Sequence, residues 1–225
     1  METCSEEKKM ITEPLLINKN PKGGIRTLPF IIANEAFERM ASTGFMPNMI
    51  LYLCREYNMK ITEGTNVLFF WSAASNFLPI LGAFLADSYV GRYAMIGFGC
   101  ITCLLGMVLL WLTTIFPHAR PLACDYTLRD SCESATGSQL MLLYLAFGLM
   151  SLGGGGIRSS SLAFGADQLE KGDGIKSKSE GALKSYFSWY YVSVSASSMV
   201  AVTFIVYIQD NLGWKVGFGI PAAIM

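Results

Sequence analysis

Glu35, Glu38 and Arg39 lie close together in an otherwise apolar run that extends from Leu28 to Leu53. Glu35 and Glu38 are three residues apart, and Glu35 and Arg39 are four apart, so a helix would place all three side chains on one face. A charged side chain costs about 2.5 kcal/mol or more at the centre of a membrane helix, so it is kept where it faces protein or water and has partners. We therefore expect these three residues to form a functional site inside the protein.

The composition is that of an integral membrane protein. Of the 225 residues, 52% are hydrophobic and 15% are charged, against about 25% charged residues in soluble domains, and the mean hydropathy is +0.40. The formal net charge is zero, which argues against a broadly basic protein that binds nucleic acid. Residues 1–27 are polar and lack the apolar core of a signal peptide, so we expect a cytosolic tail.

Membrane-spanning helices are the elements expected to position the charged residues. A span needs about 20 residues to cross the hydrocarbon core of a bilayer. Five runs are long enough: about 28–53, 65–86, 93–116, 140–164 and 187–208. A sixth run, 214–225, is too short to cross, so we expect the chain to stop inside its sixth helix. The expected fold is an all-α bundle over residues 28–225, with an extracytosolic loop at 117–139 and a cytosolic loop at 165–186.

The distribution of positive charge predicts a cytosolic N-terminus. In that orientation the segments inside the cell hold ten lysines and arginines and the outside segments hold five, with Arg39 and Arg158 left inside the membrane. An excess of Lys and Arg in short cytosolic segments is typical of membrane proteins. The same orientation puts Cys124 and Cys132 in an outside loop, where a disulfide would persist. Two unpaired thiols are the alternative, because sequence spacing does not establish that the two residues come within bonding distance.

The segment GAFLADSYVGRY follows the second predicted span and contains Asp87, Gly91 and Arg92. A tight cytosolic turn with one acid and one base could hold neighbouring helix ends together in one conformation and release them in another. The alternative is an ordinary turn, in which Asp87 caps the next helix and Arg92 follows the positive-inside rule.

Arg158 lies in the fourth predicted span, directly after four glycines and Ile157. The segment lacks the preceding strand and the Gly-Lys pair of a phosphate-binding loop, so the glycines indicate close helix packing instead. Arg158 is expected at a similar membrane depth to Glu35 and Glu38, and we predict that it faces them. The alternative is a purely structural ion pair that never contacts a substrate.

Taken together, EAFERMASTG, GAFLADSYVGRY, SLGGGGIRSSSLAFGADQ and SYFSWYYVSVSASSM resemble the plant nitrate/peptide transporter family. That family belongs to the proton-coupled oligopeptide transporters of the major facilitator superfamily. The resemblance covers nearly the whole chain and implies twelve helices in two halves, of which this chain would be the N-terminal half with its sixth helix truncated.

The resemblance also implies residue roles. Glu35, Glu38 and Arg39 match the proton-coupling motif, and Arg158 matches a basic position, commonly Lys, that would pair with charge or substrate. Asp87, Gly91 and Arg92 match the cytosolic loop signature of the superfamily. Peptide-transporting relatives usually carry an aromatic residue and a Tyr pair after the Glu-x-x-Glu-Arg turn, where this chain has Met40 to Thr43. A dipeptide substrate is therefore not favoured.

We therefore predict a proton-coupled symporter of nitrate or another small anion, present as an incomplete half that needs the C-terminal half as a partner. Fully ionised, Glu35, Glu38, Arg39 and Arg158 sum to zero charge, so one bound proton leaves +1 and an anion would restore neutrality. A plant hormone or a small peptide is the alternative substrate. The main rival is a truncated protein that does not transport but pairs with or regulates full-length transporters.

No pattern of His, Cys and acidic residues suggests an enzyme or a metal site. We therefore expect no cofactor beyond the coupling proton, and the lipid bilayer and the anion as partners. The plasma membrane is expected rather than the vacuolar membrane.

Overall fold

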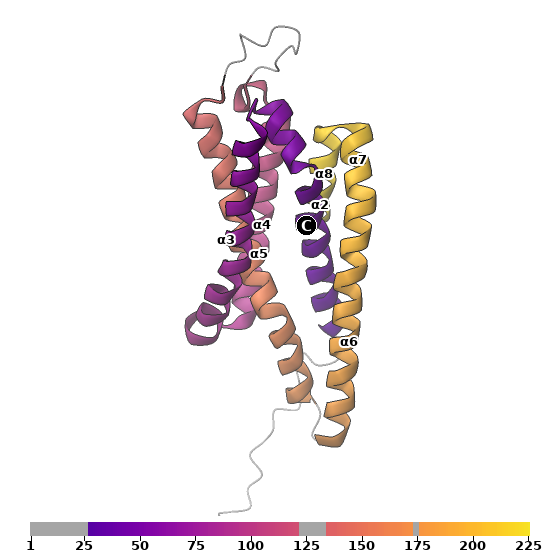
Figure 1. Cartoon of the computed structure of the whole chain (residues 1–225). Coiled ribbons are helices and arrows are strands. Elements are labelled where there is room, and N and C mark those ends of the chain that lie inside the picture. Colours follow the sequence, from indigo (N-terminus) through magenta and orange to yellow (C-terminus); the bar gives the residue numbers. More distant parts are fainter. Residues whose placement is uncertain (1–26, 122–133, 173–175) are drawn as a thin grey trace, which may run out of the picture.

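The computed structural model describes residues 27–121, 134–172 and 176–225, with side chains described except at 170–180. These residues form helices joined by short turns (Figure 1). The elements are α2 (Leu28–Glu56), α3 (Ile61–Leu85), the π-helical turn η2 (Ala86–Val90), α4 (Arg92–Ile115), the short η3 (Pro117–Ala119), α5 (Gly137–Gly172), α6 (Lys176–Val200), the π-helical turn η4 (Ala201–Ile205), α7 (Val206–Leu212) and α8 (Trp214–Ile224).

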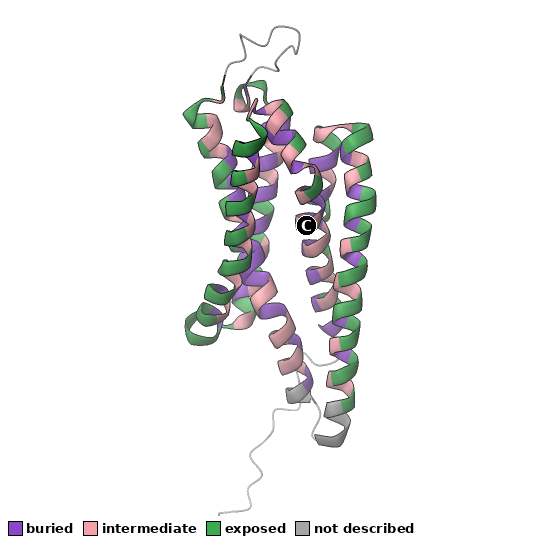
Figure 2. Cartoon of the chain, in the orientation of Figure 1, coloured by how far each residue is buried: buried purple, intermediate pink, exposed green. Residues whose placement is uncertain are grey.

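The helices form two groups that lie side by side (Figure 1). One group holds α3, α4 and the first part of α5, and the other holds α2, α6, η4, α7 and α8. Helix α5 contacts α3 and α4 most extensively and also reaches α2 and α6. It is also the most buried of the long apolar helices, whereas α3 is the most exposed (Figure 2). Helix α5, which carries Arg158, therefore connects the two groups.

Four helical stretches are long and apolar enough to cross a membrane: Ile61–Val90, Arg92–Ile115, Gly137–Leu169 and Gly181–Leu212. They overlap with four of the five expected spans. Helix α2 is long enough, at 29 residues, but it is not among these four helices. Its apolar run is interrupted by Glu35, Glu38 and Arg39, so its place in the bundle depends on packing against α5, α6 and α8.

Most of the described residues within 165–186, where we expected a cytosolic loop, are helical. Helix α5 continues to Gly172 and α6 already begins at Lys176. Hydropathy indicates where a helix leaves the apolar layer, whereas backbone hydrogen bonding decides where the helix ends. The residues concerned, including Gln168, Leu169 and Glu170, are compatible with a helix that continues into water.

Aromatic side chains pack α8 against α2. The ring of Tyr52 lies 5.2 Å from that of Trp214 and 4.9 Å from that of Phe218, and Phe45 lies 5.1 Å from Phe218, all measured between ring centroids. These pairs are edge-to-face or close to it, the arrangement that aromatic rings prefer. The buried Tyr52 hydroxyl also lies 2.7 Å from the Thr113 hydroxyl on α4. The end of α2 that follows the charged residues is thereby held in a rigid core.

A candidate proton-coupling site

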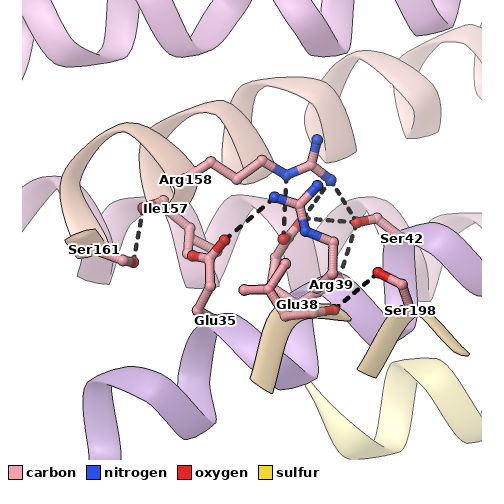
Figure 3. Close-up of polar contacts among 9 residues, drawn as sticks. Glu35, Glu38, Arg39, Ser42, Ile157, Arg158, Ser161 and Ser198 are labelled. Atoms are coloured by element: carbon pink, nitrogen blue, oxygen red, sulfur yellow. Dashed lines mark hydrogen bonds and ion pairs between the residues drawn. The ribbon is translucent and has the colours of Figure 1, made fainter. Parts of the chain in front are cut away.

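Helix α2 buries both of its central carboxylates, since the exposed fractions of Glu35 and Glu38 are 1% and 0%. Arg39 is half-buried. The three side chains point from one face of α2 toward α5, as Figure 3 shows. This arrangement follows from the local helix geometry, in which residues three and four apart are neighbours. The common face expected from the spacing is therefore present.

Arg158 of α5 binds Glu38 with two hydrogen bonds. Its Nη2 donates to Glu38 Oε1 over 3.0 Å and its Nε donates to Oε2 over 3.3 Å. Such forked contacts between a guanidinium and a carboxylate are stronger and more directional than single ones. The predicted approach of Arg158 to the carboxylates is therefore seen, with Glu38 rather than Glu35 as the partner.

Ser42 completes this contact. Its hydroxyl donates to Glu38 Oε1 over 2.7 Å and lies 2.8 Å from Arg158 Nη2, which donates to it. Ser42 is one turn beyond Glu38 on the same helix, so the hydroxyl bridges the acid and the base. In the sequence, Ser42 stands out only as part of the segment 40–43 that differs from peptide-transporting relatives. Its position four residues after Glu38 was the signal that could have identified it.

Glu35 has a weaker partner. Arg39 Nη2 lies 3.5 Å from Glu35 Oε1, and neither carboxylate oxygen meets hydrogen-bonding geometry with any residue that the structure describes. The hydroxyls of Ser161 on α5 and Tyr190 on α6 lie close enough to interact with it electrostatically. A buried carboxylate with so few hydrogen bonds is costly to keep charged.

The four glycines before Arg158 bring three helices close to α5. A Cβ built on Gly153 would overlap with the backbone nitrogen of Cys103 on α4, and one on Gly155 would lie 3.0 Å from Leu78 on α3. A Cβ on Gly154 would lie 2.9 Å from Glu38 Oε1 on α2. The packing interpretation of the glycine run is therefore correct, and Gly154 makes the room that the Glu38 carboxylate occupies.

A second charged site lies at the turn between α3 and α4. Arg92 Nε donates to Asp87 Oδ1 over 2.9 Å, and its Nη1 donates to Asp167 Oδ2 over 2.8 Å. Gly91 has a φ of 85° and a ψ of 145°, a conformation in which other residues are strained. Asp167 lies on α5, so Arg92 links the turn to that helix.

Asp167 was not predicted as a site residue, although it belongs to the GADQ segment that resembles the family. Cys124 and Cys132 lie outside the described residues. Within the described ranges, no three His, Cys, Asp or Glu side chains gather to form a metal site.

The chain resembles members of one transporter family. Residues 93–225 match the family model described as "POT family". The chain is 58% identical over 208 residues to Protein NRT1/PTR FAMILY 1.2 of Arabidopsis thaliana, covering 92% of this chain and 34% of the relative. It is 52% identical over 221 residues to Protein NRT1/PTR FAMILY 1.1 of the same plant, covering 98% of this chain and 37% of the relative.

Solved structures show the same fold. The POT family transporter PepTSo matches with a TM-score of 0.69 and 22% identity, over 88% of this chain and 35% of that one. An auto-inhibited POT family peptide transporter matches with a TM-score of 0.68 and 25% identity over the same shares. The chain thus spans about a third of the length of the relatives it matches.

Proposed function

This chain belongs to the POT family, and from that membership we propose that it forms part of a proton-coupled symporter for nitrate or another small anion. The observation that carries the proposal is the buried contact between Glu38 and Arg158, with Arg39 and Glu35 beside it. When all four groups are ionised, the two acids and two bases have a net charge of zero, so the uptake of one proton gives the site a net charge of +1.

The proposed cycle depends on the release of Arg158. When Glu38 takes up a proton, it loses the negative charge that attracts the guanidinium, and Ser42 and Arg158 can turn to another acceptor. The site then carries one net positive charge in a largely water-excluded place, and a small anion restores neutrality. Proton and anion therefore bind together and move in the same direction, because neither charge is favourable in the protein interior without the other.

We propose that the transport path lies between this bundle and a second set of six helices. In transporters built from two such repeats, the substrate site lies near the middle of the membrane, and the halves rock around it. We further propose that residues 1–27 and the turn that carries Arg92 face the cytosol, that 117–139 lies on the opposite side, and that the membrane is the plasma membrane.

Nitrate is the substrate that we favour. The site offers a forked guanidinium and a hydroxyl, which suit a planar oxyanion, and residues 40–43 lack the aromatic residues expected for a dipeptide carrier. A plant hormone with a carboxylate or a small peptide is the alternative substrate class.

The test uses two proteins in liposomes: this chain alone, and a joined protein in which it replaces the aligned region of NRT1/PTR FAMILY 1.2. Nitrate uptake is driven by an inward proton gradient. We expect the joined protein to take up nitrate and protons together, and Glu38→Gln to abolish gradient-driven accumulation.

Nitrate uptake that does not depend on the proton gradient, or that persists in the Glu38→Gln variant, would refute the proposed coupling. If the joined protein is inactive and this chain lowers the activity of a full-length relative in the same membrane, the chain is instead a regulator of transporters.

A further inference from the structure

Helices α3 and α6 each have a face that stays exposed along its length. On α3 the exposed residues recur three or four positions apart, as on one side of a helix: Asn66, Phe69, Ala73, Asn76, Ile80 and Phe84. On α6 the same spacing gives Lys184, Ser188, Tyr191, Ser195 and Met199. Of the four apolar stretches, those that contain α3 and α6 are also the least buried (Figure 2). We call these two surfaces the α3 face and the α6 face.

Both faces carry polar side chains in the middle of an apolar stretch. Asn76 lies near the middle of Ile61–Val90, and Ser195 lies near the middle of Gly181–Leu212. The Asn76 Nδ2 donates to the Ser72 carbonyl over 2.8 Å, which uses only part of the capacity of an amide with two N–H donors and one acceptor oxygen. An exposed amide is costly in lipid, so we expect Asn76 to meet a polar partner.

The exposed side of α4 has a different composition. Between positions 94 and 105 its exposed residues are Ala94, Gly97, Phe98, Ile101, Leu104 and Leu105, none of which has a polar side chain. Such a surface suits lipid, which offers no hydrogen-bond partners. In membranes, amide and hydroxyl side chains are instead typical of surfaces where helices pack together. The contrast with α4 therefore indicates that the α3 and α6 faces contact protein.

The two faces match in charge and in register. Helices α3 and α6 run in opposite directions along the bundle (Figure 1). Asp87 lies eleven residues after Asn76, and Lys184 lies eleven residues before Ser195, which is about 16 Å in each case at 1.5 Å per residue. If an α3 face is laid against an α6 face with Asn76 opposite Ser195, the exposed carboxylate of Asp87 therefore comes opposite the exposed amine of Lys184.

We propose that the α3 face of one copy of this chain packs against the α6 face of a second copy, and the α6 face of the first against the α3 face of the second. Within one copy α3 and α6 belong to different helix groups (Figure 1), so the match is available only between copies. A two-fold axis along the membrane normal makes each contact twice and keeps both copies in the same orientation. Asn76 then meets Ser195 at mid-depth, and Asp87 meets Lys184 at one membrane surface.

Cross-linking between two differently tagged copies tests this arrangement. One copy carries Asn76→Cys and the other carries Ser195→Cys, and both are placed in the same liposomes with an oxidant. Because a disulfide needs Cα atoms within about 7 Å of each other, we expect a product that bears both tags. Wild-type copies measure the background from the native cysteines. In the matched control Ile101→Cys, at an exposed position on α4, replaces Asn76→Cys, and only background should form.

A second measurement tests whether the polar residues hold the two copies together. Energy transfer between donor-labelled and acceptor-labelled copies gives the association constant as the chain is diluted in lipid. Asn76→Leu replaces the amide with an apolar group of similar size. We expect about tenfold weaker association, because each pair of copies loses two hydrogen bonds between helices. Phe98→Leu, on the exposed side of α4, is the control and should leave association unchanged.

A doubly tagged product that is no more abundant with Asn76→Cys than with Ile101→Cys would overturn the inference, as would a chain that stays monomeric at every dilution. Unchanged association in Asn76→Leu would overturn it as well, because apolar contact alone would then explain the pairing. Neither measurement uses nitrate or a proton gradient, so failure of this inference and failure of the proposed function can be told apart.

Discussion

Arg158 holds both carboxylate oxygens of Glu38 across 120 residues of sequence, with contacts of 3.0 and 3.3 Å. The Glu38 side chain is fully buried, and that of Arg158 is 21% exposed. A buried ion pair of this kind contributes little net free energy to folding, because the cost of desolvating the two charges offsets much of their attraction. Substitution of only one partner should nevertheless lower the stability, because the charge of the other partner would remain buried without an opposite charge.

Replacing Arg158 should therefore destabilise the protein. For Arg158→Ala we expect a loss of about 3–5 kcal/mol, as for other buried pairs with one partner removed, measured as a lower melting temperature in detergent. The double variant Glu38→Gln/Arg158→Gln should recover most of that loss, because neither charge remains. Additive effects of the two single changes would show that the residues do not interact energetically.

Arg158→Lys tests whether a positive charge at this position is sufficient without the planar guanidinium group. Lysine keeps the positive charge but has no planar fork to match both carboxylate oxygens. We expect stability between those of wild type and Arg158→Ala, and weaker nitrate uptake by the joined protein. Full wild-type uptake in Arg158→Lys would mean that charge alone is sufficient at this position.

Gly154→Ala tests the space beside Glu38. The added Cβ would lie 2.9 Å from Glu38 Oε1, so the carboxylate or the helix must shift, at a cost of about 1–3 kcal/mol. The matched control is Gly148→Ala on the same helix, where the new Cβ meets nothing within 4 Å. We expect a lower melting temperature only for Gly154→Ala. Equal changes in the melting temperature of the two variants would indicate an effect of helix propensity rather than of contact with Glu38.

Gly91→Ala tests the turn between α3 and α4. Its positive φ of 85° should make alanine cost about 1–3 kcal/mol through backbone strain. Gly97 on α4 also has no neighbour within 4 Å of an added Cβ, but has ordinary helical backbone, so Gly97→Ala is the control. A melting temperature that falls in neither variant would mean that the turn adapts without strain.

Asp167→Asn should affect turnover more than stability. Arg92 and Asp167 are about one third exposed, and pairs of this type contribute about 0–1 kcal/mol to stability. If the contact holds one conformation of a moving carrier, its loss should change the uptake rate of the joined protein by about fivefold or more. Asp210→Asn, at an exposed position on α7, serves as the control.

A large fall in melting temperature with no change in the uptake rate would show that the contact between Arg92 and Asp167 is purely structural. The rate is measured as initial nitrate uptake, and the melting temperature is measured on the same preparation.

Four features could be predicted from the sequence alone: the helical class, four apolar helices long enough to span a membrane, the shared face of Glu35, Glu38 and Arg39, and the family. These features depend on local spacing and on hydropathy, because a helix places residues three and four apart together whatever surrounds it. The packing role of the glycines was also predictable, because only small residues let helices approach so closely.

Which charged groups pair depends on how the helices pack against one another. Arg158 could have faced either carboxylate, and its contact with Glu38 depends on how α2 and α5 are rotated against each other. The link from Arg92 to Asp167 and the bridging position of Ser42 likewise join residues from separate helices. The full lengths of α5 and α6 were also not predicted, because hydropathy marks only the apolar part of a helix, whereas the two helices continue beyond their apolar runs.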